Sequence, residues 1–196
     1  MFLLYNILQT QGKRRYLHAR VIEVNKCYYL SMQKQENNFA FIDTTNLHKG
    51  VSDTLGWKLD YKKFRKLLTE RYGVKKAYMF MGFIPTNTGM YRDLQNRGYE
   101  IIFKPTIPTE KSTKGNCDAE LVLQAMVEYG SYDKAVIVTG DGDFYCLIEY
   151  LQKNNKLEAV ISPNVKWCSS LIKRLSNRIR HIYVEHLRAK LEFVGK

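Results

Sequence analysis

The sequence predicts an α/β fold, a three-layer α/β/α sandwich built around a mostly parallel central sheet. Short apolar runs typical of buried strands alternate with longer amphipathic segments over most of the chain. This alternation favours parallel strands joined by helical crossovers, with helices on both faces of the sheet. The chain has 196 residues, of which 45% are hydrophobic, so it can bury a sizeable core.

The regular pattern of strands and helices begins near residue 39. The segment 60–73 shows the helical pattern clearly, because its apolar residues recur at helical spacing and Gly73 offers a stop. Strands are expected at 39–43, 75–84, 100–105, 134–140, 157–162 and, at an edge, 180–184, and helices at 60–73, 87–99, 118–130, 143–155 and 165–178.

Residues 1–37 lack this pattern, and we expect them to form an N-terminal extension to a domain at 38–196. They are rich in Tyr, Gln and Asn, and two short apolar runs within them would suit a small hairpin. A second hypothesis is that the chain starts naturally at Met32, because MQKQENNFAFID would lead directly into the first regular strand. Residues 1–31 would then come from an over-extended reading frame.

The formal net charge of +12 favours a polyanionic partner, either nucleic acid or an anionic membrane surface, although ordinary basic proteins also carry such charge. None of the four cysteines forms a C-x-x-C pair, which argues against a zinc ribbon, and their spacing does not indicate a disulfide scaffold. No apolar run approaches the ~20 residues that span a bilayer, and the start lacks the order of a secretory signal. We therefore expect a cytoplasmic protein with no membrane partner, and a homo-oligomer stays open.

Four aspartates stand where this fold places chemistry. Asp43 ends the first strand, Asp118 opens the helix 118–130, and Asp141 and Asp143 follow the strand 134–140 in TGDGDF. The strands ending at 43 and 140 are expected to be central neighbours, and ligands bind beyond the carboxyl ends of such strands. Clustered carboxylates resist ionisation, and a hard cation such as Mg²⁺ or Mn²⁺ relieves their repulsion. The pattern predicts metal-assisted phosphodiester hydrolysis.

Each aspartate also has a purely structural interpretation. Asp118 and Asp143 suit helix N-caps, and Asp43 suits a turn closed with Thr45 or Asn46. Their combination on consecutive units of one α/β chain favours a site over four separate turns.

Other polar side chains are candidates for the same crevice. Asn46 could orient a water molecule, touch a phosphate or close the turn. The candidates for contact with nucleic acid, mostly through backbone phosphates, are Lys49, Lys111, Lys114, Thr139 and Ser162.

The helix 87–99 and the aromatic residues supply further candidates for substrate binding. Arg92 and Arg97 could meet phosphates, and exposed aromatic rings could stack on unpaired bases. Trp57, flanked by Gly and Lys, is the best candidate for stacking, whereas His48 is expected to be a surface residue.

Three blocks of sequence, FIDTTNL, KGNCDAELVLQAM and VIVTGDGDF, resemble the NYN domain of the PIN-like nuclease superfamily, and within it the LabA/DUF88 group. The resemblance covers about residues 38–185. The Thr-Thr pair before Asn46 departs from it, because many members have a small residue or Gly there. The resemblance implies a PIN-like sandwich and a Mg²⁺- or Mn²⁺-dependent RNase site, in which Asn46 accompanies the acidic residues Asp43, Asp118, Asp141 and Asp143 as metal-binding and catalytic groups.

The expected function is therefore a metal-dependent endoribonuclease that acts on single-stranded RNA. The alternative is an RNA-binding or regulatory NYN module with little turnover. Other phosphate enzymes fit less well, because Toprim sites need Glu after the first strand and dehalogenase-type phosphatases need D-x-D there. No P-loop sequence occurs either.

Overall fold

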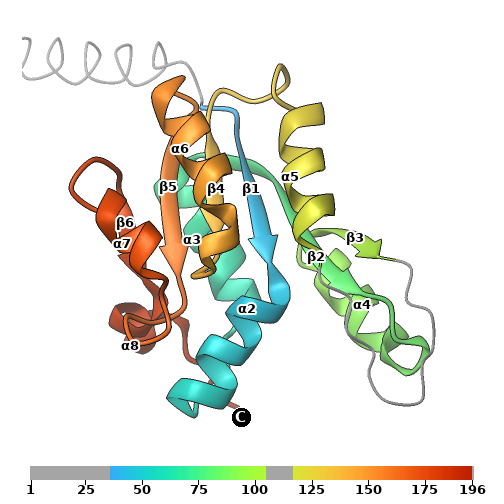
Figure 1. The fold of residues 1–196 in the computed structure, drawn as a ribbon. Coiled ribbons are helices and arrows are strands. Elements are labelled where there is room, and N and C mark those ends of the chain that lie inside the picture. Colours follow the sequence, from blue (N-terminus) through green and yellow to red (C-terminus); the bar gives the residue numbers. More distant parts are fainter. Residues whose placement is uncertain (1–35, 105–116, 196) are drawn as a thin grey trace, which may run out of the picture. The chain divides into compact units, whose positions relative to one another are not determined.

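A single sheet of six parallel strands, in the order β3-β2-β1-β4-β5-β6, forms the centre of the computed structural model (Figure 1). The structure describes residues 36–104 and 117–195, so the extension expected at 1–37 lies almost wholly outside it and stays a prediction. The strands are β1 (Asn38–Asp43), β2 (Val74–Gly82), β3 (Glu100–Lys104), β4 (Ala135–Val138), β5 (Leu157–Ser162) and β6 (His181–Tyr183).

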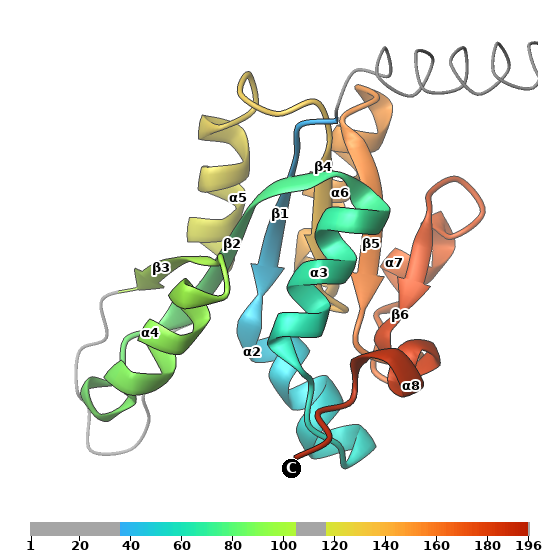
Figure 2. The same ribbon diagram turned by 180° about the vertical axis from the view of Figure 1, so that it is seen from behind.

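Helices cover both faces of the sheet, as the alternating pattern predicts. Figures 1 and 2 show α5 and α6 over one face and α3 over the other. The α-helices are α2 (Thr44–His48), α3 (Tyr61–Tyr72), α4 (Thr88–Asn96), α5 (Asp118–Val127), α6 (Tyr145–Lys153), α7 (Ser170–Leu175) and α8 (Arg188–Leu191). Shorter helical turns are η1 (Lys49–Asp53), η2 (Pro85–Asn87), η3 (Gly142–Phe144) and η4 (Val184–Leu187).

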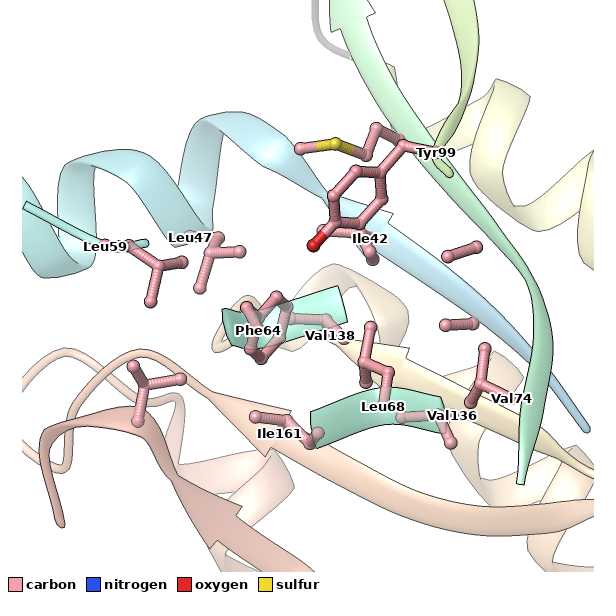
Figure 3. Close-up of a cluster of buried hydrophobic side chains, with 14 of the residues drawn as sticks. Ile42, Leu47, Leu59, Phe64, Leu68, Val74, Tyr99, Val136, Val138 and Ile161 are labelled. Atoms are coloured by element: carbon pink, nitrogen blue, oxygen red, sulfur yellow. The ribbon is translucent and has the colours of Figure 1, made fainter. Parts of the chain in front are cut away.

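Each strand contributes side chains to two separate cores, because successive residues point to opposite faces of a sheet. In β1, Ala40 and Ile42 enter the core shared with α3, α4 and α8, which Figure 3 shows in close-up. Phe39 and Phe41 enter the other core, shared with α5, α6 and α7. The three-layer sandwich is thereby confirmed, with a sheet that is entirely parallel across the described residues.

The order of the strands reverses between β1 and β4. From β1 the chain moves outward to β2 and β3, and it then returns to place β4 on the other side of β1. The segments that follow β1 and β4 pack on opposite faces of the sheet, and the carboxyl edge at such a reversal is where open α/β sheets bind ligands. The predicted pairing of the strands that end near 43 and 140 is confirmed, with Ile42 opposite Val138.

The helix predicted at 60–73 is confirmed, and its ends show why the sequence folds there. The carboxylate of Asp60 accepts the backbone N–H groups of Lys62 and Lys63, at 2.9 and 3.1 Å, and so caps the first turn of α3. Gly73 follows the last turn with φ of 61°, in the left-handed region that glycine adopts without strain.

Two segments differ from the sequence prediction. The chain after β1 continues as a helix through α2 and η1, where only a turn was expected. The helix expected at 165–178 begins later, at Ser170, because Ser169 caps it: its hydroxyl accepts the N–H of Leu171 at 3.3 Å. Residues 163–169 form instead a bridge between β5 and α7 that runs beside the carboxyl edge of the sheet.

Candidate functional site

Three carboxylates converge at the carboxyl edge of the central strands. Asp118, Asp141 and Asp143 each offer one oxygen, and these oxygens all lie within 4.8 Å of one another. Asp141 and Asp143 follow β4, and Asp118 begins α5, which packs on the same face of the sheet as Phe144. Asp118 and Asp141 are half-buried and Asp143 is exposed, so the cluster opens to solvent on one side.

The turn that carries two of these aspartates is shaped by its own side chains. Asp141 accepts the N–H of Asp143 at 3.1 Å and thereby caps η3, so Asp141, rather than Asp143 as the sequence suggested, is the capping residue. The N–H of Asp141 in turn donates to the hydroxyl of Thr139 at 3.1 Å. A Cβ atom at Gly142 would lie 2.5 Å from Oγ and 3.1 Å from Cβ of Ser169, so a larger residue between the two aspartates would have to displace the Ser169 hydroxyl that caps α7.

Asp118 is not a cap either. Cys117 occupies the N-cap position of α5, where its side chain makes no capping hydrogen bond, and Asp118 is the first residue of the helix proper. Burial raises the pKa of the Cys117 thiol to about 11, with a further contribution from the charge of Glu120, so this thiol stays protonated at neutral pH. At this end of α5, the carboxylate of Asp118 rather than the protonated thiol of Cys117 is therefore the group that suits a hard cation.

Asp43 is the fourth aspartate of the acidic group, and its oxygens are not among the three that converge. Its carboxylate accepts the N–H of Asn46 at 3.0 Å and the hydroxyl of Thr139 at 3.3 Å. Burial raises the pKa of Asp43 to about 6 despite these hydrogen bonds, and the negative charges of Asp118 and Asp141 raise it further. The site thus contains a carboxyl group that a nearby cation would help to ionise.

Asn46 joins the two halves of the site. Its side-chain oxygen accepts the N–H of Gly140 at 2.8 Å, and its own N–H donates to Asp43. One amide side chain thereby connects the end of β1 to the turn after β4. Of the roles considered from the sequence, the bond to Asp43 fits the closing of the turn, whereas the bond to Gly140 was not expected.

Thr139 and Ser162 do not lie on the rim, where contact with nucleic acid was expected. Both side chains are fully buried, so neither can reach a phosphate. Thr139 holds Asp43 and Asp141, as described above. The hydroxyl of Ser162 donates to the carbonyl of Thr139 at 2.8 Å, and its oxygen lies 2.9 Å from Nε2 of His181. In this structure, Thr139 and Ser162 hold the residues of the acidic edge in place through these hydrogen bonds.

The remaining basic and aromatic candidates fall into different settings. Lys49 and Arg92 are exposed, and His48 is a surface residue as predicted. Arg97 already forms ion pairs with two carboxylates, at 2.8 Å from Asp93 and 3.7 Å from Asp60. Trp57 is buried in the core that contains α3, with 4% of its surface exposed, so it cannot stack on a base. Lys111 and Lys114 lie outside the described residues.

Two features of this region were missed by sequence reasoning. Trp167, in the bridge between β5 and α7, is 65% exposed. His181 of β6 forms a partly buried link between Ser162 and Ser176, whose hydroxyl lies 2.9 Å from Nδ1. Burial lowers the pKa of His181 to about 4, with a smaller contribution from the charge of Lys173. No local sequence signal distinguishes these two residues.

The parallel sheet, its switch point and the acidic edge define an α/β domain with a carboxylate site of the metal-binding type. The model of the NYN domain family matches residues 39–180 of this chain. The protein therefore belongs to the NYN domain family, a family of PIN-like nucleases.

A solved structure has the same fold. The chain is similar to VPA0982, a protein of unknown function from Vibrio parahaemolyticus RIMD 2210633, with a TM-score of 0.65 and 20% sequence identity. The alignment covers 83% of this chain and 99% of that chain, and at this identity the likeness concerns the fold alone. Comparison with curated proteins gives no match. Within residues 36–104 and 117–195, no helix is long and apolar enough to cross a membrane.

Proposed function

We propose that this protein is a ribonuclease of the LabA/DUF88 type, which uses Mg²⁺ or Mn²⁺ to hydrolyse phosphodiester bonds in single-stranded RNA. The observation that carries this proposal is the convergence of Asp118, Asp141 and Asp143 at the carboxyl edge of an NYN domain. The formal net charge of +12 supports a polyanionic substrate.

The geometry of the three carboxylates fits a hard divalent cation. Mg²⁺ binds oxygen ligands at about 2.1 Å in an octahedron, so two of its ligands lie about 3.0 Å apart when adjacent and about 4.2 Å apart when opposite. The three oxygens already lie within 4.8 Å of one another, and small side-chain rotations close the difference. All donors are carboxylate oxygens, the type that Mg²⁺ and Mn²⁺ prefer.

The residues of the site divide the work. Asp118, Asp141 and Asp143 would hold the cation, which supplies Lewis acidity to polarise a phosphoryl oxygen and to activate water. Asp43 lies behind them and adds negative charge to the site when it ionises. Asn46 keeps the end of β1 and the turn after β4 in register through its bond to Gly140.

The approach of the substrate depends on cations around the acidic edge. A phosphate backbone is repelled by the carboxylates unless a cation binds there, so metal and RNA should bind cooperatively. Lys49 and Arg92 are exposed at the surface and are proposed phosphate contacts. Lys111 and Lys114, in the segment before Asp118, are proposed for the same role.

The direct test is cleavage of labelled single-stranded RNA and single-stranded DNA of the same sequence, in Mg²⁺, in Mn²⁺ and in EDTA. The wild-type protein should cleave RNA only when metal is present, and Asp141→Asn should lose this activity. Asp53→Asn is the matched control, because it removes the same charge from an exposed position on η1 and should leave cleavage intact.

Three outcomes would contradict the proposal in different ways. Cleavage that survives both EDTA and Asp141→Asn would reject the metal site. Cleavage of DNA without cleavage of RNA would reject the substrate. Tight, metal-dependent RNA binding without cleavage would replace the nuclease with a regulatory RNA-binding module.

A further inference from the structure

The bridge between β5 and α7 exposes a large aromatic side chain that contributes nothing to either core. Trp167 has 65% of its surface exposed, whereas Trp57 has 4%. Its neighbour Val165 is also exposed, at 39%. An exposed Trp forgoes the large stabilisation that burial of its ring would give, so the fold alone does not account for its position.

The backbone beneath Trp167 is held firmly in place. The N–H of Trp167 donates to the side-chain oxygen of Asn164 at 2.8 Å, and the amide nitrogen of Asn164 donates to the carbonyl of Gly50 at 2.8 Å. Asn164 is itself 1% exposed. The N–H of Val165 donates to the carboxylate of Glu185 at 3.0 Å. The ring is therefore presented from a fixed backbone, which lowers the entropic cost of binding a partner.

The same bridge packs against the turn that carries two of the aspartates. The N–H of Ser169 donates to the carbonyl of Gly140 at 2.8 Å. The Cα atom of Cys168 would lie 3.5 Å from a Cβ at Gly140, and Ser169 closes the space at Gly142. Gly140 and Gly142 flank Asp141, so the segment that carries Trp167 packs directly against the turn that carries the proposed metal ligands.

A positive charge accompanies the aromatic ring. The ammonium group of Lys166 lies 5.3 Å from the centroid of the Trp167 ring. An exposed ring beside a cation suits a nucleotide, whose base presents a flat face and whose phosphate carries a negative charge. A protein partner would gain little from carboxylates so near in the chain fold, whereas a nucleic acid strand could use both the ring and the proposed metal site.

We propose that Trp167 stacks on an unpaired base of the RNA substrate, with Lys166 at a phosphate beside it, and so fixes the strand relative to the acidic site. This rests on the proposed function for the identity of the strand. Because an aromatic ring stacks on every base, Trp167 selects unpaired over paired RNA and does not read sequence.

The test mixes the wild-type protein rapidly with a single-stranded RNA octamer in Mg²⁺ and follows tryptophan fluorescence before cleavage proceeds. Stacking should quench the emission of Trp167, while the buried Trp57 supplies a constant background. An octamer with abasic sites carries the same phosphates without bases and should not quench, and neither should a fully paired duplex.

Substitutions at the ring should follow its chemistry. Trp167→Ala should weaken binding of the octamer about tenfold or more, which corresponds to about 1.4 kcal/mol, and Trp167→Phe should stay within about threefold of the parent. Tyr150→Ala is the matched control, because Tyr150 is an exposed aromatic residue beside Tyr129, near the opposite end of α6 from the aspartates, and should bind as the parent does. The thermal unfolding of Trp167→Ala should be unchanged.

The two proposals fail separately. If wild-type protein cleaves RNA with metal, but the abasic octamer quenches as well or Trp167→Ala binds as tightly as the parent, the stacking proposal is wrong and the nuclease stands. If binding and quenching depend on the bases and on Trp167 but no cleavage occurs, the stacking proposal stands and the nuclease is wrong.

Discussion

Replacement of Asp43 by Asn should stabilise the metal-free protein near neutral pH. Burial and the charges of Asp118 and Asp141 raise the pKa of Asp43 from 3.8 to about 6. A carboxyl group with a raised pKa in the folded state costs nothing below its unfolded pKa, and its cost grows as the pH rises through the folded value. The cost is therefore absent below pH 3.8 and complete above about pH 6.

The size of the effect follows from the shift. A difference of about two pKa units corresponds to about 3 kcal/mol, which is an upper bound for the gain in Asp43→Asn above pH 6. Asn can keep both contacts, since its oxygen can accept the N–H of Asn46 and its amide can donate to Thr139. In a domain of this size, 1–3 kcal/mol raises the melting temperature by roughly 3–10 °C.

The assay is thermal unfolding in EDTA across pH 4 to 8. Asp43→Asn should melt well above the wild type at pH 7.5 and level with it near pH 4. Asp53→Asn, which loses the same charge at an exposed position, should show no such pH-dependent gain. An equal gain at both pH values, or a loss of stability at pH 7.5, would refute the account of a desolvated carboxylate held among like charges.

Three further predictions concern the metal, the turn and the partly buried histidine. Mg²⁺ at about 100 times its Kd should stabilise the wild type by about 2.7 kcal/mol, measured by thermal unfolding, and Asp141→Asn should remove this gain. Gly142→Ala should lower the free energy of unfolding by about 1–3 kcal/mol, because the added Cβ would lie 2.5 Å from Oγ and 3.1 Å from Cβ of Ser169. A second substitution, Ser169→Gly, should recover part of this loss. If it recovers none, the strain does not come from Ser169. Because burial lowers the pKa of His181 from 6.5 to about 4, its contribution to stability is complete above pH 6.5 and is lost as the pH falls. The ring is partly exposed and screened by solvent, so the loss should be about 1–2 kcal/mol. Urea unfolding of His181→Gln between pH 7 and 4.5 should show a weaker pH dependence than the wild type, and identical slopes would contradict this role.

The sequence was sufficient for the parts of the molecule that local pattern controls. Apolar runs and stop signals such as Gly73 predicted the alternating elements, and the positions of Asp43 and Asp141 at the ends of central strands predicted the acidic edge. The convergence of these elements follows from the parallel topology, since the carboxyl ends of adjacent strands meet on one side of the sheet.

The sequence was insufficient where burial depends on distant packing. Trp57 and Trp167 each adjoin a Lys, yet one fills the core beneath α3 and the other is exposed. Ser162 is the last residue of a predicted strand, a position where side chains often reach the rim of a site. In the structure, however, His181 of the edge strand β6 covers it. No local property of these residues states which neighbours the fold will bring, so their roles needed the structure.

The central strands have a consequence for how the protein loses activity. β1 and β4 lie between other strands, β4 is buried along its whole length, and Asn46 fastens their carboxyl ends together. Their amide hydrogens should exchange with solvent only when the whole domain unfolds, whereas those of the three-residue edge strand β6 should exchange through local opening. The turn η4 follows β6 directly and supports the bridge that carries Trp167 through Glu185. Mild denaturant should therefore weaken the proposed contact between Trp167 and RNA while the aspartates keep their positions. Weaker binding of the proposed RNA substrate should therefore precede the unfolding of the acidic edge.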